Sequence, residues 1–146
     1  MPDQPQTMPD ATTLPPSRGE IVVLNRDLMF GIQIGNVLRA AGFRATSTST
    51  TPTFVDRLRD PEAAAVLGII NMVALVDWDL VADVMAGDSP TPVLAFGPHV
   101  NVPLWRSARA AGVTRVVSNG YFHRDMLSLV ERYARLASPE PDPSPP

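Results

Sequence analysis

Residues 64–71 read Ala-Ala-Val-Leu-Gly-Ile-Ile-Asn, an unbroken apolar run that ends on an amide side chain. A run of this kind, without polar alternation, is typical of a strand that is buried on both faces of a parallel sheet. A shorter run at residues 21–24 has the same character and is followed by Asn25. We therefore predict two buried parallel strands, at 21–24 and at 64–70.

Helical patterns alternate with strand patterns along the rest of the chain. Asp27 can cap a helix whose apolar residues recur at a spacing of three or four, and Gly42 stands where that helix would end. Pro103 lies where a first helical turn tolerates proline, and Gly112 follows the helix that it opens. The predicted strands cover 21–24, 43–47, 64–70, 93–96 and 115–117, and the predicted helices cover 30–41, 53–59, 80–85, 104–111 and 121–136.

Alternating strands and helices imply βαβ units, and right-handed crossovers place helices on both faces of the sheet. Five such units within residues 20–137 predict an α/β, flavodoxin-like (CheY-like) doubly wound sheet with strand order 2-1-3-4-5. In this fold a ligand or reaction site lies beyond the carboxyl ends of the first, third and fourth strands. The residues at that edge are therefore the candidates for function.

The composition excludes several classes of protein. Hydrophobic residues make up 45% of the chain and charged residues 18%, which is typical of a globular domain. There is no cysteine, so disulfides, thiolate metal sites and cysteine nucleophiles are excluded. Lysine is also absent, and all 12 basic side chains are arginine. No basic footprint for nucleic acid and no leader or membrane span is recognisable, so we expect a cytoplasmic protein.

Proline divides the chain into a central domain and two tails. Residues 1–19 and 138–146 are rich in proline and poor in large apolar residues, so we predict that both are disordered. The acidic residues of the tails account for the formal charge of −3, and residues 20–137 are close to neutral. No output domain is recognisable, and we expect a stand-alone domain whose regulated activity is supplied in trans.

Polar residues or glycine follow four of the predicted strands at the carboxyl edge of the sheet. They are Asn25-Arg26-Asp27, Asn71, Gly97-Pro98-His99 and Ser118-Asn119-Gly120. Together with the element order, this set resembles the receiver domains of bacterial two-component response regulators over roughly residues 20–136. The resemblance implies acidic Mg²⁺ ligands after the first strand, a phosphoacceptor aspartate after the third, Ser or Thr after the fourth and Lys-Pro after the fifth.

The sequence departs from that receiver pattern at nearly every position. Asn25 and Arg26 fall on the acidic pair, with Asp27 one step away, and Asn71 falls on the phosphoacceptor. Gly97 and Asn119 fall on the Ser/Thr and Lys positions. An amide is not an anionic nucleophile, and Mg²⁺ prefers carboxylates. We therefore predict a non-phosphorylatable pseudo-receiver that is not an enzyme and has no metal or other cofactor.

Two alternatives remain open from the sequence. The alignment after the third strand could be shifted, with Asp77 or Asp79 nearby, although both carboxylates also suit the cap of the next helix. The second alternative is a flavodoxin-like small-molecule or sensory module, whose strand-end pocket would be built from Asn25, Asn71, His99 and Asn101. The other histidine, His123, is expected to face solvent.

Aromatic and arginine side chains gather on the predicted fourth helix and at the start of the last one. Such side chains are favoured in protein interfaces. In receivers the helix 4–strand 5–helix 5 face is the usual one for dimerisation or docking. We therefore expect a protein partner or a second copy of the chain to bind there, at Trp105, Arg106, Arg109, Tyr121 and Arg124.

Overall fold

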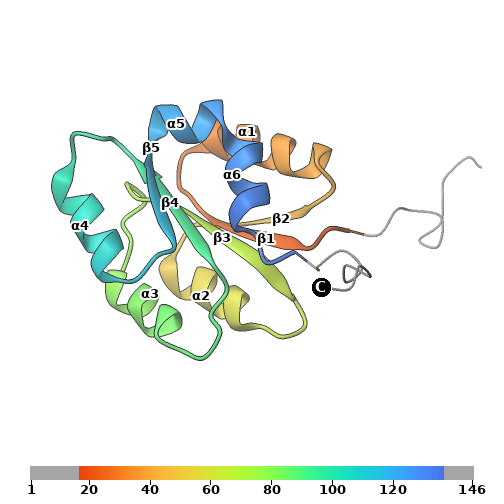
Figure 1. The fold of residues 1–146 in the computed structure, drawn as a ribbon, viewed down its shortest axis with the longest axis horizontal. Helices are drawn as coiled ribbons and strands as arrows, with labels where there is room; N and C mark the ends of the chain where they lie inside the picture. Colours follow the sequence, from red (N-terminus) through yellow and green to blue (C-terminus); the bar gives the residue numbers. More distant parts are fainter. Residues whose placement is uncertain (1–16, 137–146) are drawn as a thin grey trace, which may run out of the picture.

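The computed structural model describes residues 17–136 and shows one five-stranded sheet in the order β2-β1-β3-β4-β5 (Figure 1). Every neighbouring pair of strands is parallel. The predicted fold class and strand order are confirmed. The strands are β1 (Glu20–Leu24), β2 (Arg44–Thr48), β3 (Ala65–Asn71), β4 (Val93–Gly97) and β5 (Arg115–Ser118).

The helices cover both faces of the sheet, three on each (Figure 1). One face is covered by α1 (Leu28–Ala40), α5 (Asn119–Arg124) and α6 (Met126–Tyr133). The other is covered by α2 (Thr51–Arg59), α3 (Trp78–Met85) and α4 (Val102–Ala110). Alternate residues of the central strands enter the two cores: Val22 and Ile70 pack with α2–α4, and Val23 and Ile69 with the other helices. Burial on both faces explains the unbroken apolar runs.

Side-chain caps set the start of several helices as the sequence indicates. The Asp27 carboxylate accepts a hydrogen bond from the Phe30 N–H at 2.9 Å, and the Asp77 carboxylate accepts from the N–H groups of Asp79 and Leu80. Gly42 and Gly112 adopt φ values of 96° and 86° beyond the ends of α1 and α4. Glycine tolerates this left-handed region better than other residues, so both helix-to-strand corners are formed without strain.

The last predicted helix is divided in two. The sequence predicts one helix over 121–136, but the chain leaves the helical conformation at Asp125, where φ is −120° and ψ is 30°. There the Asp125 carboxylate pairs with Arg124 at 3.0 Å. The first half also begins earlier than predicted, because the Ser118 hydroxyl caps it by accepting a hydrogen bond from the Tyr121 N–H.

Most of the two predicted tails lies outside the described residues. The described part of the first tail, residues 17–19, contacts the domain through Arg18. The Arg18 Nη1 donates hydrogen bonds to the Ala41 carbonyl and to the Glu131 carboxylate. The Arg18 guanidinium also lies 4.6 Å from the Phe43 ring centroid. No helix among residues 17–136 is both long and apolar enough to cross a membrane.

Candidate functional site at the carboxyl ends of the strands

Asn25 and Asn71 lie side by side at the carboxyl edge of the sheet. Leu24 pairs with Ile70 in the β1–β3 register, so the next residue of each strand extends to the same point. The Asn71 Nδ2 donates a hydrogen bond to the Asn25 Oδ1 at 2.9 Å. Asn71 is only 2% exposed, whereas Asn25 is half-buried. The two amides form a neutral pair where the resemblance implies carboxylates.

The remaining polar atoms of this pair bond to the backbone of the adjoining loops. The Asn25 Nδ2 donates to the Asp27 carbonyl at 2.6 Å, and its Oδ1 also accepts from the Asp27 N–H at 3.2 Å. The Asn71 Oδ1 accepts from the Val73 N–H at 3.3 Å. Both amides are therefore bonded within the protein and hold the β1–α1 and β3–α3 loops in place.

The donor set does not fit a divalent cation. Asp27 has the nearest carboxylate in sequence, and that group caps α1. Arg26, between Asn25 and Asp27, is exposed and would oppose a cation. Among residues 17–136 no group of three or more His, Cys, Asp or Glu side chains is placed to hold a metal ion. Mg²⁺ usually needs one or two carboxylates.

The end of β4 is filled by an apolar side chain. A Cβ atom added at Gly97 would lie 2.8 Å from the Met72 Cε and 3.3 Å from the Met72 Cβ. Met72 is 1% exposed, so its thioether occupies the space beside the Gly97 backbone. A serine or threonine there would have to displace it. Met72 was not predictable as part of this site, because only the fold brings its side chain to Gly97.

Comparison with known proteins agrees with this fold. No protein-family model matches the chain. Transcriptional regulatory protein FixJ of Bradyrhizobium diazoefficiens is 25% identical over 123 residues, covering 84% of this chain and 60% of that protein. The structure of full-length FixJ from B. japonicum superposes with a TM-score of 0.66 at 22% identity, over 81% of this chain and 58% of that one. The present chain thus spans somewhat more than half of the FixJ length.

Two further solved structures match over nearly their whole length. The chemotaxis response regulator CheY4 of Vibrio cholerae has a TM-score of 0.66 at 12% identity, over 80% of this chain and 99% of its own. The receiver domain of NtrX from Brucella abortus has a TM-score of 0.64 at 14% identity, over 77% and 96%. The chain has the receiver fold.

Two polar side-chain atoms of α5, which follows the fifth strand, are buried and make no hydrogen bond among residues 17–136. Asn119 begins α5, and its Oδ1 is buried and makes no hydrogen bond among the described residues. One helical turn later, the His123 Nε2 is also buried and makes no hydrogen bond among the described residues. The His123 ring packs against Phe30 and Phe122, at centroid distances of 4.3 and 5.2 Å. The expectation that His123 faces solvent was wrong, and its burial lowers the pKa of the imidazole.

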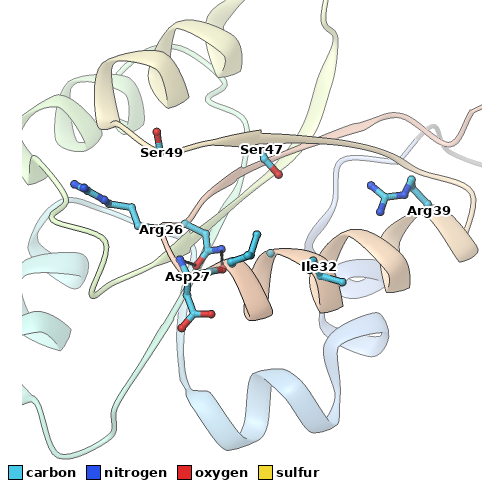
Figure 2. Close-up of a pocket in the computed structure, with 9 residues that line it drawn as sticks. Arg26, Asp27, Ile32, Arg39, Ser47 and Ser49 are labelled. Atoms are coloured by element: carbon cyan, nitrogen blue, oxygen red, sulfur yellow. Dashed lines mark hydrogen bonds between the residues drawn. The ribbon is translucent and has the colours of Figure 1, made fainter.

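The other two residues of the expected strand-end pocket have different surroundings. His99 is exposed in the β4–α4 loop, and Asn101 caps α4 through its Oδ1, which accepts from the Leu104 N–H at 3.3 Å. The structure has a pocket of about 430 Å³ between α1 and β2, on the side of β1 that faces away from β3 (Figure 2). Asn25 lines it, but Asn71, His99 and Asn101 do not.

The residues of the expected interaction face lie on α4 and α5, which flank β5 in the receiver fold (Figure 1). The Trp105 indole N–H donates to the Pro98 carbonyl at 3.0 Å, and the Arg109 guanidinium lies 5.3 Å from the Trp105 ring centroid. Tyr121 is half-buried beside the guanidiniums of Arg115 and Arg124. Trp105 therefore holds the β4–α4 loop, and the exposed groups of this face are arginines.

Proposed function

We propose that this chain is a signalling domain of the receiver fold that is not phosphorylated and acts by binding a protein. The observation that carries the proposal is the hydrogen bond from the Asn71 Nδ2 to the Asn25 Oδ1. It puts a neutral amide donor where phosphoryl transfer needs an anionic oxygen nucleophile. The proposed domain is a pseudo-receiver, and it is not an enzyme.

The surroundings of Asn71 support the same conclusion. Phosphoryl transfer depends on cations that stabilise charge on the transferred group. The sequence contains no lysine, and the nearby Arg26 is exposed rather than turned to a partner at the strand ends. The polar oxygens of Asn25 and Asn71 already accept hydrogen bonds from the protein. A phosphoryl group would have to break these bonds without gaining a metal or an ammonium group.

Mg²⁺ and beryllofluoride, a phosphoryl mimic, are expected to leave the amide NMR spectrum of this chain unchanged. The Asn25–Asn71 amide pair stands where the carboxylates that would bind Mg²⁺ and the phosphoryl mimic are expected, so neither additive has a site there. A receiver domain that carries the acidic residues serves as the positive control for the reagents. Shifts at Asn25, Asn71 and Gly97 that require both additives would show that receiver chemistry survives, and would refute the proposed loss of phosphorylation.

For the binding surface we propose the α4–β5–α5 face, with a protein partner or a second copy as occupant. Arg106, Arg109 and Arg124 are exposed there, and two of them lie against Trp105 and Tyr121. Guanidiniums held on aromatic rings lose less freedom on binding than unsupported ones, and both side-chain types are enriched in interfaces. An acidic surface on the partner would complement them.

Charge reversal at Arg106→Glu and Arg109→Glu together is expected to abolish any dimer that this chain forms, because the two carboxylates that replace the guanidiniums would repel an acidic partner surface. Sedimentation velocity over a concentration series measures the dimer. Arg59→Glu, on the exposed side of α2, is the matched control and should leave it intact. A double variant that dimerises like the wild type would rule this face out, and a monomeric wild type would rule out a second copy as the partner.

A further inference from the structure

The pocket between α1 and β2 has walls of different chemistry (Figure 2). Ser47 and Ser49 approach it from β2 and the loop that follows, whereas Leu28, Ile32 and Arg39 approach it from α1. Its volume of about 430 Å³ is within the range of small-molecule sites. None of these five residues belongs to the amide pair or to the α4–β5–α5 face.

Two glycines of α1 lie close to side chains that line this pocket. A Cβ atom at Gly31, which lines the pocket, would lie 3.1 Å from the Asn25 Nδ2. A Cβ atom at Gly35 would lie 2.9 Å from both Nη atoms of Arg39. The Arg39 side chain therefore lies back along the helix over Gly35, and in Figure 2 its guanidinium points toward the space below Ser47.

The charge of the lining favours an anion. Arg26 and Arg39 both line the pocket, and neither belongs to an ion pair among residues 17–136. Arg39 makes a hydrogen bond at 3.3 Å to the neutral Asn36 Oδ1. The one acidic side chain of the lining, Asp27, has its carboxylate bonded to the start of α1. Guanidinium and serine hydroxyl groups together are typical donors to carboxylate, sulfonate and phosphate oxygens.

Another part of the lining, formed by the first turns of α1, is apolar and exposed to water. Leu28 is 77% exposed and Ile32 is 49% exposed, and they lie one helical turn apart at the pocket. Exposed side chains of this size cost free energy unless something covers them. A ligand with only charged groups would leave them in contact with water, whereas an apolar or aromatic ring system would cover both.

We propose that this pocket binds a small amphipathic anion. The anionic group lies against the Arg39 guanidinium and the Ser47 hydroxyl, with Arg26 adding positive charge, and the apolar body lies on Leu28 and Ile32. This inference is independent of the proposed loss of phosphorylation, because no step of it uses Asn71 or the α4–β5–α5 face.

Anilinonaphthalene sulfonate is the probe for this proposal, and the neutral N-phenylnaphthylamine has the same kind of apolar body without the sulfonate. The sulfonate is expected to shift the backbone amides of Gly31, Ile32 and Ser47 in the NMR spectrum of the wild type. Arg39→Gln should weaken its affinity by about tenfold, the size expected for one lost charge-assisted contact. The affinity of the neutral probe should stay the same.

Arg59→Gln, which removes an exposed arginine from α2 on the other face of the sheet, is the matched control and should leave both affinities unchanged. Ser47→Ala tests the hydroxyl separately and should weaken only the sulfonate. The proposal is overturned if the shifts lie elsewhere, or if none appears at concentrations up to about 1 mM. It is also overturned if Arg39→Gln, confirmed to be folded by its spectrum, binds the sulfonate as tightly as the wild type does.

Discussion

Asn71→Asp is expected to lower the free energy of unfolding by about 2–4 kcal/mol without making the domain phosphorylatable. The new carboxylate would occupy a position that is 2% exposed and would face the Asn25 Oδ1, so an acceptor replaces the donor of the present bond. No cation among residues 17–136 is placed against it, because the nearby arginine, Arg26, is exposed. Urea denaturation measures the loss, and labelling with a phosphoryl donor tests the chemistry.

Asn36→Asp is the control for this variant, since it makes the same substitution on the exposed side of α1. It should change the stability by less than about 0.5 kcal/mol, as surface substitutions usually do. The variant at Asn71 should also show no Mg²⁺-dependent response to beryllofluoride, because Arg26, Gly97 and Asn119 are unchanged. An Asn71→Asp variant that is as stable as the wild type and becomes labelled would contradict this prediction, and would show that one amide separates this chain from an active receiver.

Arg57→Ala is expected to destabilise the domain by about 2–4 kcal/mol, because it leaves a buried carboxylate without its main partner. Glu20, the first residue of β1, is 2% exposed. Arg57 from α2 bonds to both of its oxygens, at 2.5 Å from Nε and 2.8 Å from Nη2, whereas Arg44 lies 3.8 Å away. The Arg57 side chain is 40% exposed, so water screens part of its interaction with Glu20 and limits the loss of stability.

Denaturant unfolding of Arg57→Ala beside Arg59→Ala checks this prediction. Arg59 lies two residues further along α2 and is exposed, so its loss should cost less than about 0.5 kcal/mol. Equal effects of the two substitutions would contradict the assigned role of the Glu20–Arg57 pair.

The same pair predicts a pH dependence of stability. The hydrogen bonds from Arg57 hold the pKa of Glu20 below its usual value, against the opposing effect of burial. The stabilisation is therefore complete above the unfolded-state pKa of about 4.3 and is lost as the pH falls through the lowered folded-state pKa. Glu20→Gln should be less stable than the wild type at neutral pH, and its melting temperature should fall less steeply in acid.

The strands and helices of this domain were largely predictable, because the spacing of apolar residues along the chain indicates which faces are buried. The runs at 21–24 and 64–70 have no polar alternation, and both are central strands covered on two faces. Asp27 and Asp77 lie before apolar-periodic segments and cap the helices there. The break at Asp125 was not predictable, because the apolar spacing continues across it while the backbone does not.

Residue types and their spacing along the chain were enough to predict the fold and the strand order, and they show that lysine is absent and that position 71 is not an aspartate. Which side chains meet depends on the tertiary structure. The Asn25–Asn71 bond joins residues 46 positions apart through the β1–β3 register, and Met72 fills the space at Gly97. The burial of His123 and the pocket between α1 and β2 likewise depend on how whole elements pack. Periodicity shows that a face is buried, but it carries no information on the partner that buries it.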